Sequence, residues 1–545
     1  MKLRPYQDEA RKAVWEEWNS GRAKTLLVLP TGCGKTIVFS AIAEDSVRKG
    51  GRVLVLAHRG ELLEQAADKI MKTTGLGCSV EKAEQSCIGQ WYRVTVGSVQ
   101  TLMRAKRLEQ FSQDYFDTII IDEAHHAISD SYQAILNHFN NAKVLGVTAT
   151  PDRGDQKNLG KVFDSLAYEY TLPQAIKEGY LVPIKALTVP VRIDFTKVGT
   201  SAGDYKPSDI ATALDPYLEQ IAEEMTKHCS NRKTVVFLPL VKTSQKFRDI
   251  LNKHGFRAAE VNGESADRAE ILEDFDKGKY NVLCNSMFLT EGWDCPEVNC
   301  VVVLRSTKVR ALYCQMVGRG TRLAKGKDHL LLLDFLWHTE RHELCRPACL
   351  IAENQEVAEK MTEKITEAGC PIDIEEVERT ASEDVVNERE SALAEKLEKV
   401  RNRKSKLVDP MQYAMSIQDN SLTNYVPTFG WESNPISDSQ KQALVQRGIN
   451  PETVTSSGQA EKILRSCGLR QVEGLATPKQ IRALERYGFQ HVGKWSFTAA
   501  KNMIDRIACI GWKGVPRGID PKTYTPQRKN KWNIKMTILK NYLNT

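Results

Sequence analysis

Short apolar runs alternate with amphipathic stretches between residue 24 and about residue 340 of this chain. Each run is a few residues long, is rich in β-branched side chains and is bounded by polar or turn residues. Such runs are typical of the central strands of parallel sheets, which crossover helices bury on both faces. The runs expected to form strands are residues 26–29, 53–56, 119–121, 144–147, 235–238, 282–283, 301–304 and 330–333.

The spacing of these runs predicts two α/β lobes in tandem. The first set of runs ends near residue 185, and the second begins near residue 230. We therefore expect a first lobe over residues 1–185, a connection over 186–229 and a second lobe over 230–350. A chain of 545 residues is too long for a single core, and a division into roughly three or four domains is expected.

The strand pattern stops beyond residue 350. Residues 351–409 are charged and rich in helix-forming residues, which predicts a helical linker. Residues 410–510 contain a repeat whose units read as Ser/Thr start, helix, glycine stop, loop and helix. This small, mostly helical domain could bind DNA or a protein partner, or could simply be a compact product of duplication. Positions that match across 40 residues are Gln440 with Gln480, Ala443 with Ala483, Leu444 with Leu484, Gly448 with Gly488 and Ala460 with Ala500.

Residues 511–545 form a basic tail. This segment contains eight basic residues and one acidic residue, so it accounts for the whole net charge of +7. Interleaved aromatic residues suit base stacking beside phosphate attraction. A solubilising terminus explains the same composition, and both interpretations stay open. The aromatic residues concerned are Trp512, Tyr524, Trp532 and Tyr542.

The thirteen cysteines are scattered, and several lie within apolar runs. This pattern is typical of reduced thiols in the cytoplasm rather than of a disulfide framework. The apolar runs are too short to span a bilayer, and the N-terminus has no signal-peptide pattern. We therefore expect a cytoplasmic protein without a membrane partner.

A candidate phosphate loop follows the first predicted strand and opens a helix. Gly32 and Gly34 let backbone N–H groups close around phosphate oxygens at a helix N-terminus, where the helix dipole favours anions. Lys35 can reach the β- and γ-phosphates of ATP, and the Thr36 hydroxyl can ligate Mg²⁺. The strict pattern of such loops is missed, because leucine stands at its first glycine position. The loop consists of Pro30, Thr31, Gly32, Cys33, Gly34, Lys35 and Thr36.

An acidic pair, Asp122 and Glu123, ends the predicted strand at residues 119–121. Acidic residues at the carboxyl end of such a strand lie beside the phosphate loop. Asp122 would hold Mg²⁺ through water, and Glu123 would orient the attacking water. A surface acidic cluster would explain the pair in isolation, but the upstream loop makes a nucleotide site the better interpretation.

Together with further motifs in the same order, these residues resemble a superfamily 2 helicase of the DEAH class, in the RadD, XPB-like and type III restriction motor group. The resemblance extends from Leu3 to Arg322, about 60% of the chain. It implies two tandem RecA-like lobes that hydrolyse ATP at their interface. It also implies that Gln7 reads the adenine edge.

The motifs and the resemblance together assign site residues. Outside the phosphate loop, the residues expected to bind ATP or Mg²⁺ are Arg4, Gln7, Asp122, Glu123, Gly292, Asp294, Arg319 and Arg322. The residues implied to couple the ATP state to the grip on a strand are His125, Thr148 and Thr150. The residues implied to contact nucleic acid are His58, Arg59, Ser98, Gln100, Thr101 and Thr290. The expected catalytic set is Lys35, Asp122, Glu123, Gln315, Arg319 and Arg322.

The resemblance places Arg319 and Arg322 of the second lobe against the γ-phosphate. Negative charge builds on the transferring phosphoryl oxygens, and arginines from a facing domain are worth roughly 10³–10⁵ in rate, or roughly 4–7 kcal/mol. Hydrolysis would then require the lobes to close, which makes ATP binding a conformational signal.

Two features modify these expectations. Cys33 places a thiol in the phosphate loop, where the helix N-terminus and Lys35 would lower its pKa and make ATP hydrolysis sensitive to alkylation. Only 20 residues separate Asp294 from Gln315. This leaves little room for a long strand-separating hairpin, so translocation is better supported than unwinding.

A zinc site is a further possibility near the end of the second lobe, because four potential ligands have helical spacing there. Four ligands spread over about three turns of a continuous helix cannot converge on one tetrahedral ion. We expect structural side chains and no structural zinc. The four residues are His338, His342, Cys345 and Cys349.

The sequence thus predicts an ATP- and Mg²⁺-dependent DNA translocase or helicase in repair, recombination or replication, acting on single-stranded or branched DNA. The resemblance implies 3′→5′ movement. One alternative is an RNA-directed motor, because the strand-gripping motifs touch a backbone that DNA and RNA share. Another is an ATP-gated clamp or scaffold that recruits an unknown protein partner through the C-terminal repeats.

Overall fold

The structure is a computed structural model. The residues it describes are 3–57, 60–83, 85–149, 159–194, 198–201, 204–263, 265, 267–286, 293, 295–338, 345–352, 354–392, 407–417, 419, 422, 425, 427, 429–521 and 523–526. The chain forms two compact units. The first comprises Met1–Ala381 and Thr428–Gly430, and the second Ser382–Pro427 and Trp431–Thr545. Within the described residues, every helix is too short or too polar to cross a membrane.

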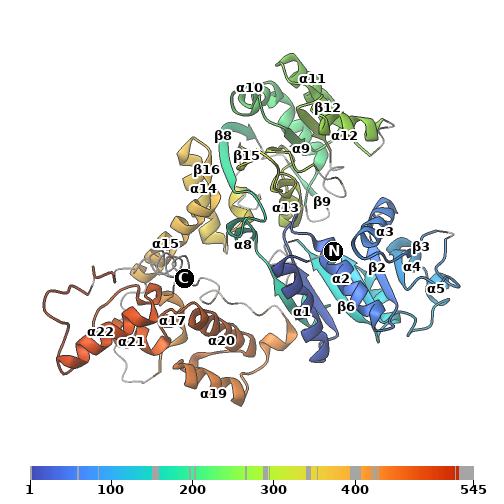
Figure 1. Cartoon of the computed structure of the whole chain (residues 1–545). Helices are drawn as coiled ribbons and strands as arrows, with labels where there is room; N and C mark the ends of the chain where they lie inside the picture. Colours follow the sequence, from blue (N-terminus) through green and yellow to red (C-terminus); the bar gives the residue numbers. More distant parts are fainter. Residues whose placement is uncertain are drawn as a thin grey trace, which may run out of the picture. The chain divides into compact units, whose positions relative to one another are not determined.

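A seven-stranded parallel sheet forms the first lobe, drawn mainly in blue in Figure 1. Its strand order is β3-β4-β2-β5-β6-β1-β7. Every residue of β2 and β4 is buried, as expected for central parallel strands. The predicted strands of this lobe are therefore confirmed. The strands are β1 (Lys24–Val28), β2 (Val53–Ala57), β3 (Cys78–Glu81), β4 (Val94–Ser98), β5 (Thr118–Asp122), β6 (Lys143–Thr148) and β7 (Ser165–Glu169).

Helices α1 and α2 join this sheet to the turns that will form the site. Helix α1 begins with Pro5, because proline lacks the N–H that a first helical residue leaves unbonded. Helix α2 begins directly after Gly34, at the carboxyl end of β1. Strands β5, β6 and β1 are adjacent, so their carboxyl ends meet at one edge of the sheet. The helices of this lobe include α1 (Pro5–Asn19), α2 (Lys35–Arg48), α3 (Gly60–Thr74), α4 (Val99–Leu102), α5 (Ala105–Leu108), α6 (Asp130–His138) and α8 (Leu172–Lys177).

The second lobe contains another seven-stranded sheet, of order β12-β13-β11-β14-β15-β8-β16. All its pairings are parallel except that of β16 with β8. The predicted fold class, two parallel-sheet α/β lobes followed by a helical region, is confirmed. The strands are β8 (Ile184–Asp194), β11 (Thr234–Phe237), β12 (Ala258–Val261), β13 (Val282–Asn285), β14 (Cys300–Val303), β15 (Leu330–His338) and β16 (Ile372–Asp373).

The segment expected to connect the lobes, residues 186–229, is part of the second lobe. Strand β8 pairs with β15 along its length. Helices α9 (Pro207–Leu214) and α10 (Leu218–Cys229) pack against the same core as β11. The sequence pattern missed this because the partners of β8 lie about 150 residues away along the chain.

The first half of the expected charged linker, residues 351–409, is packed against the second lobe and does not form a separate linker. Helix α14 (Gln355–Ala368) contacts β8 and buries Val357, Met361 and Ile365. Strand β16 adds an edge to the second sheet, and Figure 1 shows α14 close to β8 and β16. Helix α15 (Ile374–Ala392) follows. The linker residues 393–406 lie outside the described residues.

The continuous helix assumed when a zinc site was set aside is wrong. Residue His338 ends strand β15, and Cys349 lies in a 3-10 helix (Pro347–Leu350). Residue His342 lies outside the described residues. The helical spacing in the sequence therefore does not describe the arrangement of His338 and Cys349.

The second unit contains the two 40-residue repeats, each with the same local structure. Ser437 caps the first helix of one repeat, and Thr477 caps that of the other. Nε2 of Gln440 donates to the Ser457 carbonyl at 3.1 Å, and Nε2 of Gln480 donates to the Phe497 carbonyl at 3.1 Å. Both repeats share one core. Their helices are α19 (Asp438–Arg447), α20 (Ser457–Val472), α21 (Pro478–Glu485) and α22 (Phe497–Cys509).

The first part of the expected basic tail belongs to this unit rather than standing apart from it. The Tyr524 ring lies 5.8 Å from that of Phe489 and 5.4 Å from that of Trp495. Tyr524 is partly buried against the shared core. Residues 527–545 lie outside the described residues.

We predict that Gln480→Ala destabilises the second unit by about 1–2 kcal/mol, because it removes a helix cap and the bond to the Phe497 carbonyl. Gln440→Ala is the matched change in the other repeat and should cost less, since Gln440 is less buried. The urea transition of the second unit measures both. Equal costs, or no cost for Gln480→Ala, would contradict the prediction.

Candidate functional site

The candidate phosphate loop, residues 30–36, joins β1 to α2 at the carboxyl edge of the first sheet. Gly32 and Gly34 have φ angles of +92° and +77°, which side chains with a Cβ rarely adopt. A Cβ at Gly34 would lie 2.7 Å from Nε2 of Gln7. The loop therefore makes a turn that requires glycine, and the first N–H groups of α2 lie at the end of this turn. Such an arrangement favours anions.

A partly buried ion pair lies next to this loop. Nζ of Lys35 is 2.9 Å from Oε1 of Glu123, and the backbone N–H of Glu123 donates to Oδ1 of Asp122 at 3.0 Å. Glu123 has a left-handed backbone, with φ of 52°. This strained turn at the end of β5 directs its carboxylate to Lys35.

The charges of this cluster are held by burial and by each other. Burial raises the pKa of Asp122 to about 6, and the nearby Glu123 carboxylate acts in the same direction. Burial also acts to raise the pKa of Glu123, but the charges of Lys35 and His125 outweigh it and lower this pKa. Burial alone would lower the pKa of Lys35, yet the two carboxylates raise it. Lys35 and Glu123 therefore stay charged near neutral pH.

Helix α1 holds the phosphate loop from the other side. The Tyr6 hydroxyl and Nε2 of Gln7 both donate to the Cys33 carbonyl, at 2.8 and 3.1 Å. Oε1 of Gln7 accepts the backbone N–H of Arg4 at 3.0 Å, and the Arg4 guanidinium lies over the Tyr180 ring. Gln7, expected to read an adenine edge, here binds the loop backbone.

The residues expected to couple the site to strand grip lie beside the acidic pair. Nδ1 of His125 is 3.6 Å from Oε2 of Glu123. Thr148 ends β6, the strand between β1 and β5, and is fully buried. Among the described residues, its hydroxyl has no hydrogen-bond partner. Thr150 lies outside the described residues.

Helix α13 (Arg310–Gly318) of the second lobe delivers its predicted residues to the same place. The Gln315 side chain lies close enough to Glu123 to act on its carboxyl, and it lowers the pKa of that group. Arg319 follows the helix, is 7% exposed, and donates through Nη1 to the Trp293 carbonyl. The positive charge of Arg319 also acts on the pKa of Lys35. The two lobes therefore meet at the ion pair.

Arg322 lies directly against the phosphate loop. Its Cγ is 3.3 Å, and its Nε 3.8 Å, from the position of a Cβ on Gly32. Burial lowers the pKa of Arg322 to about 10, so the guanidinium stays charged near neutral pH. Arg322 thus faces the loop, whereas Arg319 is buried and bonded to the Trp293 carbonyl of its own lobe.

Sequence reasoning missed Lys69, on α3. Its side chain keeps access to solvent, but surrounding protein and the charge of Arg322 lower its pKa, while Asp122 opposes this. The lysine therefore lies within electrostatic reach of the acidic pair. It belongs to none of the motifs, and nothing in the local sequence distinguishes it from other surface lysines.

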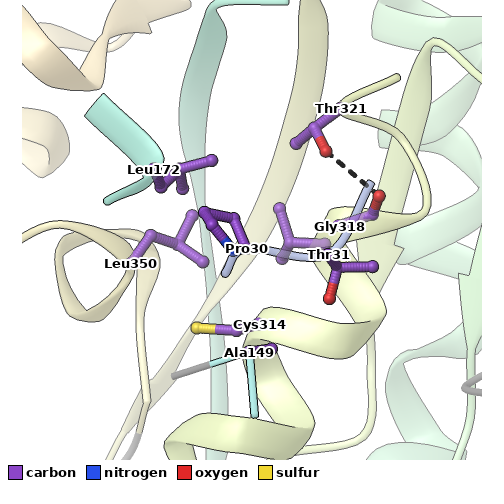
Figure 2. A pocket seen from close by; sticks show the side chains of 9 residues that line it. Pro30, Thr31, Ala149, Leu172, Cys314, Gly318, Thr321 and Leu350 are labelled. Atoms are coloured by element: carbon purple, nitrogen blue, oxygen red, sulfur yellow. Dashed lines mark hydrogen bonds between the residues drawn. The ribbon is translucent and has the colours of Figure 1, made fainter. Parts of the chain in front are cut away.

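A small pocket next to the phosphate loop is lined by residues of both lobes (Figure 2). Figure 2 shows Thr31 beside Gly318, whose carbonyl accepts a hydrogen bond from the Thr321 hydroxyl at 3.1 Å. A Cβ on Gly318 would lie 2.5 Å from Cβ of Thr31. The lobes therefore touch where only glycine leaves room. The pocket is lined by Pro30, Thr31, Ala149, Leu172, Cys314, Val317, Gly318, Thr321 and Leu350.

The side chains expected to touch nucleic acid are only partly described. Ser98 and Thr101, at the end of β4 and in α4, are buried, and Thr101 Oγ1 accepts the Ala83 N–H at 3.0 Å. Gln100 is exposed. In this conformation only Gln100 of the three presents its side chain to solvent. The remaining predicted site residues outside the described set are His58, Arg59, Thr290, Gly292 and Asp294.

The oxygens of Thr36 and Asp122 are of the kind that bind a hard divalent cation. Thr36 lies in the first turn of α2, and Asp122 ends β5. Lys35 and Lys69 both place positive charge near the two carboxylates. A further cation therefore fits the oxygen donors of this cluster, and the phosphates of a bound nucleotide would supply the negative charge that it balances.

The expectation for Cys33 was wrong. The side chain is fully buried, and burial raises the pKa of its thiol to about 12. The charges of Arg4 and Lys35 act in the expected, lowering direction but are outweighed. Local reasoning counted the helix and the nearby lysine, and could not know that α1 covers the loop.

Two family models match the chain. Residues 1–153 match "Type III restriction enzyme, res subunit", and residues 217–324 match "Helicase conserved C-terminal domain". The first match lies in the first lobe and the second match in the second lobe.

Relatives and solved structures agree with these matches. A Saccharomyces cerevisiae protein that carries the name ATP-dependent helicase IRC3 is 31% identical, over 61% of this chain and 51% of its own. A Schizosaccharomyces pombe protein named mitochondrial ATP-dependent helicase irc3 is 33% identical, over 62% of this chain and 57% of its own. The chain thus spans about half the length of these relatives. The ATP-dependent Type ISP restriction-modification enzyme LlaBIII bound to DNA shares the fold, with a TM-score of 0.51, 17% identity, and coverage of 92% of this chain and 43% of that one.

We predict that Gly318→Ala lowers turnover of any nucleotide bound here by at least tenfold, because the added methyl group meets Thr31 and holds the lobes apart. Binding of the nucleotide to the first lobe should change little. Gly320→Ala is the matched control. Its methyl group would meet Leu330 within the second lobe, so it should cost about 1–3 kcal/mol of stability instead. Steady-state kinetics and thermal unfolding of both variants separate the effects, and normal turnover in Gly318→Ala contradicts the prediction.

We predict that Cys33 resists iodoacetamide at pH 8. A thiol with a pKa of about 12 is about one part in 10⁴ thiolate at that pH, and the side chain is covered. The exposed Cys370 and Cys509 serve as internal controls that should be alkylated. Mass spectrometry of the folded protein provides the measurement. Rapid labelling of Cys33, with loss of ATP turnover, would restore the original expectation.

Proposed function

The chain belongs to superfamily 2 of the helicases, in the group of restriction-enzyme motors and XPB, and on this premise we propose that it is an ATP-driven motor that moves along nucleic acid. ATP would bind between the lobes, and its hydrolysis would be coupled to repeated closing and opening of the lobes.

One observation carries this proposal. Lys35 and Glu123 form a partly buried ion pair in the first lobe, and Gln315 and Arg322 of the second lobe lie close to Glu123 and to the phosphate loop. A surface salt bridge needs no such arrangement, whereas phosphoryl transfer needs cations on both sides of the γ-phosphate.

The residues of the first lobe take separate roles in this proposal. The N–H groups at the start of α2 and Lys35 would bind the phosphates. Phosphate oxygens would compete with Glu123 for Lys35, and a change of partner would release the Glu123 carboxylate to orient the attacking water. Thr36 and Asp122 would hold Mg²⁺, which neutralises phosphate charge when bound.

The second lobe would supply the remaining positive charge. Arg319 and Arg322 would stabilise the charge that builds on the transferring oxygens, worth roughly 10³–10⁵ in rate. Because Arg322 already lies against the phosphate loop, a small closure of the lobes suffices to bring it to the phosphate. Lys69 would add to the positive potential of the cleft.

We propose DNA as the track, with movement 3′→5′ and a role in repair, recombination or replication. The first lobe matches a family named for restriction enzymes, a class that acts on DNA. An RNA-directed motor and an ATP-gated clamp are the competing outcomes of the same experiments. Translocation without unwinding is favoured over strand separation, because the short segment between Asp294 and Gln315 leaves little room for a long strand-separating hairpin.

Lys35→Ala and Glu123→Gln should each abolish nucleic-acid-stimulated ATP hydrolysis, with a loss of at least 10³-fold. Both should leave salt-sensitive nucleic-acid binding mostly intact, because neither residue contacts the track. Lys72→Ala, an exposed lysine on α3, is the matched control and should behave as the unaltered protein. Steady-state ATPase assays with and without DNA or RNA provide the measurement.

Displacement of streptavidin from one biotinylated end of a single strand tests movement directly. A motor of the proposed polarity displaces streptavidin from the 5′ end, requires ATP, and fails in the Lys35→Ala variant. ATP hydrolysis without displacement from either end would favour the clamp, and stimulation by RNA alone would favour the RNA motor.

A further inference from the structure

An exposed tryptophan marks the end of the second repeat. Trp512 follows helix α22 and is 53% exposed. Its φ angle is +61°, in the left-handed region that residues with a Cβ disfavour. A bulky aromatic residue in such a turn, facing water, is unfavourable on both counts. Positions of this kind are candidates for function.

The protein holds this conformation in place. The backbone N–H of Trp512 donates to the Ile507 carbonyl at 3.1 Å. The Tyr487 hydroxyl donates to the Trp512 carbonyl at 3.1 Å, and the Tyr487 and Trp512 rings lie 6.4 Å apart. The indole is therefore presented from a fixed turn.

The chain that follows packs back onto the unit. A Cβ on Gly488 would lie 3.6 Å from Cβ of Pro521, and the Tyr524 ring enters the core beside Phe489 and Trp495. The aromatic residues of this basic segment thus divide into two kinds. Tyr524 is structural, whereas Trp512 faces solvent although both flanks of it are anchored.

Three exposed cations accompany the indole. Lys513 is its neighbour in sequence, Arg486 adjoins Tyr487, and Arg517 lies in the same turn-rich segment. Within the described part of the chain none of the three forms an ion pair, whereas Lys441 and Lys494 of the same unit do. Their charge is therefore available to a ligand.

The first repeat provides an internal comparison. The position 40 residues before Trp512 is Val472, which is 88% exposed, and the position before Lys513 is Glu473. Val472 is the last residue of α20, whereas Trp512 lies beyond the end of α22 in a left-handed turn. The two repeats therefore differ here in residue type and in backbone, so Trp512 is not part of the framework that the repeats share.

We propose that Trp512, with Arg486, Lys513 and Arg517, forms a site for single-stranded nucleic acid on the second unit, outside the motor lobes. An unpaired base would stack on the indole, and the cations would neutralise neighbouring phosphates. A duplex hides its base faces, and a protein partner would need a wider apolar surface than one indole offers. The site would hold the strand while the lobes change their grip.

Fluorescence anisotropy with labelled oligodeoxythymidine and the full chain, without ATP, tests the site. Trp512→Ala should raise the Kd roughly 5- to 150-fold, which is the effect of losing one stacked base. Trp512→Phe should retain most of the affinity, because it keeps an aromatic face. Val472→Ala, which removes an exposed aliphatic side chain from the end of α20, is the control and should bind as the unaltered protein.

Two further measurements identify the contact. Replacing Arg486, Lys513 and Arg517 by alanine should reduce the slope of log K against log salt by about 2, since each single-strand phosphate contact contributes about 0.7. An oligonucleotide carrying 5-iodouracil should crosslink to the peptide that contains Trp512, as located by mass spectrometry.

Unchanged affinity of Trp512→Ala, or the absence of a crosslink to that peptide, overturns the proposal. Failure of the motor proposal is distinguishable. The binding assay needs no ATP, so Trp512-dependent binding without ATP hydrolysis would leave this site standing. ATP hydrolysis at saturating oligonucleotide should be the same in Trp512→Ala as in the unaltered protein.

Discussion

Buried charge has to be balanced, and this constraint organises the first unit. Asp122 and Glu123 lie side by side at the end of β5, and Lys35 pairs with Glu123. Placing two carboxylates side by side in a largely buried site is costly, and burial raises the pKa of Asp122. Arg322, from the other lobe, contributes positive charge to this cluster. The lobes are therefore linked by electrostatics as well as by packing.

The fold could be predicted where a short stretch of sequence is enough to indicate an element. Strands such as β2 are apolar throughout, and this pattern is visible in the sequence. Strands β8 and β16 did not, because the partner of β8 is β15, far along the chain, and β16 has only two residues. The helical repeats were readable for the opposite reason. Their caps and glycine stops lie within a few residues of each helix end.

The site followed the same division. Lys35, Glu123, Gln315 and Arg322 were recognisable from motifs, and the structure brings them together. The sequence did not predict the surroundings of individual side chains. The pKa of Cys33 depends on its cover by α1 rather than on its neighbours in sequence, and Lys69 approaches the acidic pair from a helix that no motif marks.

The duplicated hairpins allow one copy to vary while the other preserves the architecture. Gln440 and Gln480 make the same interhelical bond, and Leu444 and Leu484 occupy the same core. Because these contacts hold each copy in the same fold, the exposed residues at the ends of the two copies can differ. Duplication inside a single chain can in this way supply an additional exposed surface, on which a new recognition property can arise while the shared core stays unchanged.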